Sequence, residues 1–305
     1  MQEGECIRIL QEAAEMGSKE VAFSGGEPFA WQPLPRAIEI AKNNGLRVLV
    51  YTSGNIPKAS QMISSIKQAG ADVCIFSIFG ANREKHEAIT GSKDSFVNTR
   101  EAISAANRVN LETQLHFVPL SFNYDQLRYI ALLSKEFSIK SISVLRFVPQ
   151  GRGSSLQHAL LSKPQNLELK NAIEQLRREG FTIRTGAPYN FLMTNPHPQC
   201  CAAINRLTVD PNMLIYPCDA FKKLPAKHIA GTTAFSSLKK HSLMECWEKS
   251  PYLNTVRKFL ITPFDEPCSS CEDLIKCFSG CLAQKVIAHG YLAKRPDPMC
   301  LKFAT

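Results

Sequence analysis

The sequence predicts an α/β fold, in which a partial βα barrel is followed by a small cysteine-rich C-terminal domain. Two observations support this prediction. Over the first 185 residues, short runs of β-branched residues alternate with amphipathic helical stretches, a pattern typical of parallel strands joined by crossover helices. Nine of the eleven cysteines then lie between Cys200 and Cys300. We expect two domains, at residues 1–190 and 191–305.

The predicted barrel has six strands. They are the β-branched runs at residues 20–24, 46–52, 72–78, 111–118, 141–148 and, with a weaker pattern, 181–185. Amphipathic stretches between these runs, such as 34–44 and 125–137, are predicted helices. Six units are too few for a complete eight-stranded barrel. The helical stretch at 3–16 has no strand before it, so we expect the first strand of the barrel to be missing.

Beyond Pro188 the βα pattern stops. The segment GAPYNFLMTNPHPQCC has three prolines and no clear period, which indicates loops, and we expect short strands, turns and cysteines after it. No apolar run approaches the roughly 18 residues of a membrane span. The N-terminal residues also lack the basic and apolar regions of a signal peptide. We therefore expect a cytoplasmic protein without a membrane partner.

The formal net charge of the chain is +9, which could suggest an acidic partner. The Lys and Arg residues are, however, spread along the sequence, with no basic stripe and no interleaved aromatic residues. Nucleic-acid binding would favour such a stripe. We therefore expect no nucleic-acid partner.

Small and polar residues follow several of the predicted strands. They are the segments SGGEP (24–28), TSGN (52–55) and PQGRG (149–153), together with Ser77 and Gly80. In βα folds, ligands bind at the C-terminal ends of the strands, so the shared position of these residues indicates a pocket for a small polar molecule. For any single segment, an ordinary turn is the alternative.

The segment SGGEP has the clearest chemical meaning. Gly25 and Gly26 allow a ligand to approach the backbone without a Cβ in the way, and the carboxylate of Glu27 can accept hydrogen bonds from an ammonium group. A tight turn with a solvated Glu27 is the alternative. The sequence has no phosphate-binding loop, no G-x-G-x-x-G run and no G-x-S-x-G elbow, so sites of those types are not predicted.

Four thiols lie within fourteen residues in the segment CSSCEDLIKCFSGC (268–281). Such crowding in a long cytosolic chain indicates metal ligation rather than disulfides. The candidate ligands are Cys200 and Cys201, of which one or both would bind, and Cys218, Cys268, Cys271, Cys277, Cys281 and Cys300. Cys6, Cys74 and Cys246 lie in helical or strand-like runs and are expected to be buried apolar residues.

The spacing Cys-x2-Cys-x5-Cys-x3-Cys favours iron–sulfur clusters over zinc. Zinc ribbons usually separate two Cys-x2-Cys pairs by about 15–20 residues, whereas here the second pair is Cys-x3-Cys and follows after five residues. Neighbouring cysteines can serve different clusters, and the interleaved spacing permits this. Two zinc sites of four cysteines each are the alternative.

The segments FSGGEP, TSGN, SIFGANREKHEAITGSKDSF and FVPQGRG, in this order, resemble the core of the radical SAM superfamily. The cysteine pattern from Cys218 to Cys300 resembles the SPASM (twitch-type) extension of that superfamily. The resemblance implies an oxidoreductase or maturase that modifies a peptide or protein through a 5′-deoxyadenosyl radical. It also implies S-adenosyl-L-methionine (SAM), two auxiliary [4Fe-4S] clusters and an electron donor such as flavodoxin or ferredoxin.

The resemblance also implies residue roles. Gly25, Gly26 and Glu27 would meet the methionyl amino group of SAM, and Ser77 would lie near its carboxylate or ribose. The implied ligands of the distal auxiliary cluster are Cys268, Cys271, Cys277 and Cys300. The implied ligands of the proximal cluster are Cys218 and Cys281, with Cys200 or Cys201.

Three features depart from the family pattern. Thr90 stands where the family often has arginine, and YPC stands where the family usually has Gly-x-Cys at the second cysteine of the extension. The sequence also lacks the Cys-x3-Cys-x2-Cys motif that binds the catalytic cluster in the family. We therefore expect that the chain as given does not cleave SAM and is the C-terminal part of a longer protein. The alternatives are a non-catalytic, degenerate protein that binds peptides or transfers electrons, and a zinc-stapled interaction protein.

Overall fold

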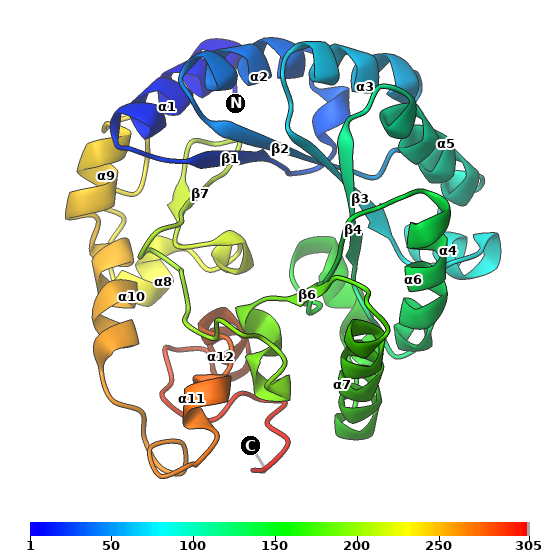
Figure 1. Cartoon of the computed structure of the whole chain (residues 1–305). Coiled ribbons are helices and arrows are strands. Elements are labelled where there is room, and N and C mark those ends of the chain that lie inside the picture. The colour runs from blue at the N-terminus through cyan, green and yellow to red at the C-terminus, as the bar shows by residue number, and fades with distance from the viewer. Residues whose placement is uncertain (304–305) are drawn as a thin grey trace. The chain divides into compact units, whose positions relative to one another are not determined.

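The computed structural model describes residues 1–303 and confirms the predicted α/β class (Figure 1). Six strands form one sheet, in which they lie in the order of the sequence. Their bounds are β1 Glu20–Phe23, β2 Arg47–Thr52, β3 Val73–Ile78, β4 Glu112–Phe117, β5 Ile142–Val144 and β6 Ile183–Thr185. Neighbouring strands from β1 to β5 pair in parallel, as crossover helices require. The partial barrel is therefore a half-barrel of parallel strands.

Helices alternate with these strands. Their bounds are α1 Glu3–Glu15, α2 Leu34–Asn43, α3 Ala59–Gln68, α4 Arg83–Thr90, α5 Ser95–Arg108, α6 Leu127–Glu136 and α7 Lys163–Arg178. Helix α2 shows why they form: its buried residues recur with helical spacing, at Leu34, Ala37, Ile38 and Ala41. In Figure 1, helices α1 to α6 follow the outer side of the curved sheet.

The two faces of the sheet differ because alternate side chains of a strand point to opposite sides. The outer face, which the helices cover, holds completely buried residues: Val48, Val50, Cys74, Phe76, Leu115 and Phe117. The inner face holds a smaller apolar cluster of Leu49, Val73 and Ile75. Nearer the C-terminal ends of the strands this inner face becomes polar, where Ser77 pairs in register with His116.

Strand β5 is shorter than the sequence predicts. The prediction covers residues 141–148, whereas the strand ends at Val144. The carbonyl of Phe147 accepts a hydrogen bond from the side-chain amide of Gln284 at 3.0 Å, so this backbone is paired with a side chain and not with a neighbouring strand. The other five strands lie within two residues of their predicted bounds.

The chain divides into two compact units. The barrel unit consists of residues 2–145 and 171–184, and the cysteine unit of residue 1, residues 146–170 and the residues from 185 onward. Helix α7 and strand β6 contribute residues to both units. The domain boundary at residue 190 stays a prediction.

The cysteine unit contains two short strands and several helices. Their bounds are β7 Thr208–Val209, β8 Ile215–Tyr216, α8 Ala226–Ala230, α9 Leu243–Lys249, α10 Pro251–Ile261, α11 Leu274–Cys277 and α12 Leu282–His289. The short strands confirm the prediction, but helices α9 and α10 were not predicted. Their start signals are present in the sequence: Ser242 and Glu245 form a capping box, and Pro251 is the first residue of α10.

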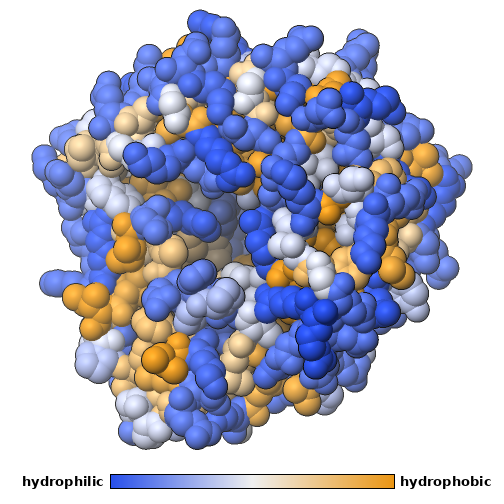
Figure 2. Space-filling model, in the orientation of Figure 1, coloured by the Kyte–Doolittle hydropathy of each residue, from blue (hydrophilic) through white to orange (hydrophobic). Residues whose placement is uncertain are grey.

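Hydrophilic side chains cover most of the face drawn in Figure 2, and apolar side chains are scattered among them. Single exposed apolar residues, such as Ile261 and Ile275, are ordinary on a protein surface. Every helix within residues 1–303 is too short or too polar to cross a membrane.

Candidate cofactor site and cysteine groups

Glu27 joins the end of β1 to the end of β2. Its Oε1 accepts hydrogen bonds from Thr52 Oγ1 at 2.7 Å and from the backbone N–H of Phe29 at 3.1 Å. Its Oε2 accepts from the backbone N–H and the hydroxyl of Ser53, at 2.9 and 2.6 Å. A carboxylate offers about four acceptor positions, so protein donors use all of them. Glu27 is therefore not the solvated side chain of a simple turn.

Gly25 and Gly26 leave the backbone beside Glu27 open. Gly25 has φ +137°, a conformation that other residues rarely adopt. A Cβ added at either glycine would meet no atom within 4 Å, and both residues are exposed. A ligand can therefore approach the backbone here, where each peptide offers a carbonyl acceptor.

The loop after β2 is held from a second side. Thr99 on α5 donates to the carbonyl of Ser53 at 2.7 Å, and the side-chain amide of Asn98 donates to Asn55 Oδ1 at 2.8 Å. The amide of Asn55 donates in turn to Ser92 Oγ at 3.1 Å. Hydrogen bonds therefore connect the segments SGGEP and TSGN to the start of α5, and they fix the geometry of this strand-end site.

The segment after β3 packs closely on helix α4. A Cβ at Gly80 would lie 2.5 Å from the Cβ of Lys85, so only glycine fits there. The backbone N–H of Phe79 donates to His86 Nδ1 at 3.3 Å. Thr90 Oγ1 contacts Ser95 Oγ at 2.7 Å. These contacts order the loop that follows Ser77, whose side chain is half-buried on β3.

Because His86 is buried, the stability of the fold should decrease in acid. Burial lowers the pKa of His86 from 6.5 to about 4, so between these pH values His86 is protonated in the unfolded chain but stays neutral in the folded chain. The unfolding free energy is therefore unaffected by His86 above pH 6.5 and decreases by about 3 kcal/mol as the pH falls toward 4. We expect His86→Asn, which keeps an acceptor but does not titrate, to flatten the pH dependence of the unfolding free energy between pH 7 and 4.5. An unchanged slope would contradict the prediction.

Sequence reasoning missed an aromatic pair on the inner face of the sheet. The rings of Tyr51 and His116 have centroids 4.9 Å apart. In the register of the sheet, Tyr51 pairs with Ile75 and His116 pairs with Ser77. The two-residue period of strands was the signal that could have placed them with Ser77.

Three thiols interact electrostatically with one another, and we call them the proximal group: Cys200, Cys218 and Cys281. Burial raises the pKa of Cys218, and the neighbouring Cys281 and Cys200 raise it further. Burial likewise raises the pKa of Cys281 to about 11. Cys201 differs from Cys200 because it is exposed, with its Sγ 3.9 Å from the carbonyl of Gln199.

Four further thiols form the distal group: Cys268, Cys271, Cys277 and Cys300. Burial raises the pKa of Cys268, and Cys300 and Cys271 contribute to the increase. Burial raises the pKa of Cys277 to about 11, and Cys300 and Cys268 add to it. Within residues 1–303, no group of three or more His, Cys, Asp or Glu side chains is arranged to hold a single metal ion. Cys6, Cys74 and Cys246 are buried, as predicted.

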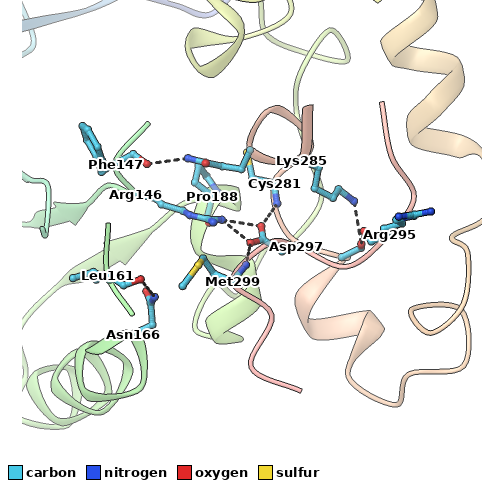
Figure 3. Close-up of polar contacts among 12 residues, drawn as sticks. Arg146, Phe147, Leu161, Asn166, Pro188, Cys281, Lys285, Arg295, Asp297 and Met299 are labelled. Atoms are coloured by element: carbon cyan, nitrogen blue, oxygen red, sulfur yellow. Dashed lines mark hydrogen bonds and ion pairs between the residues drawn. The ribbon is translucent and has the colours of Figure 1, made fainter. Parts of the chain in front are cut away.

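Asp297 holds the loops that carry cysteines of both groups (Figure 3). Its carboxylate accepts hydrogen bonds from Arg146 Nη1 at 2.8 and 2.9 Å, from the N–H of Cys281 at 3.1 Å and from the N–H of Met299 at 2.9 Å. The pair is buried, since the Arg146 and Asp297 side chains are 7% and 1% exposed. A Cβ at Gly280, where φ is +76°, would lie 2.3 Å from Asp297 Oδ2. No pattern in the sequence indicated this arrangement.

In βα-barrel proteins, ligands bind at the C-terminal ends of the strands, and in this half-barrel the segments SGGEP and TSGN lie at those ends. Residues 1–133 match the model of the Radical SAM superfamily. This range includes β1 to β4 and the segments SGGEP and TSGN. The matched residues therefore include the strand-end site built around Glu27.

Three solved structures are similar over nearly the whole chain. Streptococcus suis SuiB bound to S-adenosylmethionine has a TM-score of 0.78 at 16% identity, over 98% of this chain and 70% of SuiB. SuiB bound to the precursor peptide SuiA has a TM-score of 0.77 at 15% identity, over 98% and 69%. Histidine-tagged anSMEcpe with bound AdoMet has a TM-score of 0.75 at 15% identity, over 98% and 81%. At these identities the likeness shows a shared fold.

Proposed function

We propose that the chain serves a radical SAM reaction that modifies a peptide or protein. The superfamily match over residues 1–133 supports the reaction class. The fold likeness to SuiB and anSMEcpe supports the substrate class, because both have been crystallised with peptides. A cytoplasmic setting and an electron donor such as flavodoxin or ferredoxin belong to the same proposal.

The strand-end site of the barrel unit would bind SAM. The backbone carbonyls at Gly25 and Gly26 would accept hydrogen bonds from the methionyl ammonium, and the open space beside these glycines supports this role. Glu27 would act by holding the loop, because protein donors already use its acceptor positions. Ser77 would donate to the carboxylate or ribose of SAM.

The cysteine unit would hold two auxiliary [4Fe-4S] clusters in a SPASM-type domain. The distal group would bind one cluster through four thiolates, and the proximal group would bind the other, with Cys200 rather than Cys201 as the ligand. Each cluster of this type takes up to four cysteine ligands. Because burial favours the protonated thiols, cluster binding would release protons. The separation of seven thiols into these two groups is the observation that supports the proposal most.

When bound, SAM and a reduced [4Fe-4S] cluster supply a 5′-deoxyadenosyl radical that abstracts a hydrogen atom from the substrate. The chain would bind and orient SAM at the strand ends. The apolar cluster on the inner face of the sheet, Leu49, Val73 and Ile75, would help to exclude water from that reaction. We assign the catalytic cluster to none of residues 1–303.

Anaerobic reconstitution tests the proposal. We expect about eight iron atoms per chain, since each of two clusters contains four, together with visible charge-transfer absorption. Stoichiometric zinc without visible absorption in anaerobically purified protein would instead support the zinc-stapled interaction protein. Because the catalytic cluster is assigned to none of residues 1–303, this chain should form no 5′-deoxyadenosine with reductant and peptide, whereas iron-loaded protein that fails to bind SAM would favour a non-catalytic partner that binds peptides or transfers electrons.

Replacing Glu27 with Ala should weaken SAM binding about tenfold or more. The variant loses four hydrogen bonds that hold the loop, so the carbonyls at Gly25 and Gly26 lose their fixed position. Each hydrogen bond that is then lost to the charged methionyl ammonium contributes roughly 1.5–3 kcal/mol. Isothermal titration calorimetry with SAM, under anaerobic conditions, would measure the loss. Glu39→Gln, at an exposed acid on α2 paired with Arg36, is the matched control and should bind like the wild type. Equal affinities of all three proteins would show that SGGEP is only a turn.

A further inference from the structure

Lys285 is a buried cation in the cysteine unit to which the proposed function gives no role. It lies on α12, about one helical turn after Cys281, and is 2% exposed. Its Nζ donates a hydrogen bond to Ser279 Oγ at 3.0 Å and lies 5.5 Å from the ring centroid of Phe264. Burying an ammonium group costs free energy unless nearby groups compensate its charge, so its surroundings indicate what it does.

Thiols of both groups interact electrostatically with this ammonium. The Ser279 hydroxyl that binds Lys285 also lies 3.4 Å from Cys268 Sγ, so one hydroxyl separates the cation from the distal group. The thiols with which Lys285 interacts electrostatically are Cys268 and Cys277 of the distal group and Cys200 and Cys281 of the proximal group. One side chain therefore acts on four thiols that belong to two groups.

No carboxylate within residues 1–303 forms a direct ion pair with Lys285. Asp297 is the carboxylate among its electrostatic partners, but it is bound to Arg146 at 2.8 Å and to two backbone N–H groups. The second lysine nearby, Lys294, adds positive charge. Burial lowers the pKa of Lys285, whereas Asp297 and the nearby thiols raise it, so the cysteine groups are among the partners that favour its charged form.

We propose that Lys285 is a fixed positive charge shared by the two cysteine groups, and that it raises the reduction potentials of both clusters that these groups hold. This inference rests on the proposed function, because it requires the clusters. A cluster that accepts one electron becomes more negative by one charge, so a nearby cation stabilises the reduced form more than the oxidised form. The effect is strong at a buried site because the surroundings screen the charge only weakly.

Lys285→Met tests the proposal in the reconstituted full chain. Methionine fills a similar volume without the charge. We expect the variant to retain its iron, and the midpoint potentials of both clusters to fall by about 59 mV or more, which is a tenfold change in a one-electron equilibrium. Electron paramagnetic resonance during a dithionite titration would follow each cluster. Lys285→Arg, which keeps the charge, should stay close to the wild type.

Lys294→Met is the matched control. Lys294 is also buried, with its Nζ 4.6 Å from the ring centroid of Phe264, but its electrostatic partners are Lys285 and Asp265 rather than a thiol. We therefore expect it to shift the potentials less than Lys285→Met does.

Three results would overturn the proposal: unchanged potentials in Lys285→Met, an equal shift in Lys294→Met, or a shift in Lys285→Arg as large as in Lys285→Met. If Lys285→Met loses iron, the midpoint potentials are measured instead in Lys285→Gln, which has a polar but neutral side chain. Loss of iron from Lys285→Gln as well, with iron retained in Lys285→Arg, would show a structural role and also overturn it. A wild-type chain that binds no iron would reject the proposed clusters themselves, which the iron content reports separately from the potentials.

Discussion

Asp297→Ala should lower the unfolding free energy of the cysteine unit by about 3–5 kcal/mol, the cost of removing one partner of a buried ion pair. The variant leaves the guanidinium of Arg146, which is 7% exposed, without its carboxylate. It also leaves the backbone N–H groups of Cys281 and Met299 without their acceptor. Urea unfolding followed by circular dichroism, under anaerobic conditions, would measure the change.

Two further variants separate the charge from the packing. Arg146→Met combined with Asp297→Ala removes the unpaired charge, so the double variant should be more stable than Asp297→Ala alone. Glu39→Ala breaks an exposed pair with Arg36, in which the Glu39 and Arg36 side chains are 51% and 54% exposed, and should cost about 1 kcal/mol or less. An Asp297→Ala effect as small as that of Glu39→Ala would show that the buried pair does not stabilise the unit.

Cys271→Ser should remove about half of the iron from the reconstituted chain. The distal group would lose one of its four thiolates, whereas the proximal group would keep all of its ligands, and a [4Fe-4S] cluster is held by cysteine thiolates. Metal binding and folding are coupled in small metal-binding domains, so the variant should also unfold at a lower urea concentration. Iron content per chain and visible absorbance would measure the loss.

Cys200→Ser and Cys201→Ser form a matched pair of controls on neighbouring thiols. Cys200 lies with Cys218 and Cys281, whereas Cys201 is exposed and faces the carbonyl of Gln199. We expect Cys200→Ser to lower the iron content and Cys201→Ser to leave it unchanged. The reverse result would assign the ligand to Cys201, and full iron in Cys271→Ser would contradict the distal assignment.

The strands could be predicted because their signal is local. Runs such as 46–52 and 72–78 combine β-branched residues with flanking polar segments, and the observed strands β2 and β3 differ from them by one residue each. The end of β5 could not be predicted in the same way. The carbonyl of Phe147 accepts its hydrogen bond from Gln284, which lies 137 residues further along the chain.

The sequence predicts where the candidate site lies, at the strand ends, but not the hydrogen bonds within it. The placement of small polar residues after β1 and β2 follows from the general rule that ligands meet strand ends. That Thr52 and Ser53 already satisfy the carboxylate of Glu27 depends on the register of two strands, which one sequence does not reveal. The pair Arg146 and Asp297 is separated by 151 residues, and neither residue stands in a pattern that indicates a partner.

The division of the chain has a consequence for dissecting this protein. The chain leaves the barrel unit after Leu145, returns for residues 171–184 and then leaves again. A fragment cut at residue 190 would therefore contain Asp297 but not Arg146, and its buried acid would lack the guanidinium that neutralises it. During synthesis, β6 can join the sheet only after residues 146–170 have been made, although these belong to the other unit. The two units are thus unsuited to separate expression by a single truncation, and a fragment that respects them needs its two main segments joined by a new linker, for example residues 2–145 to residues 171–184.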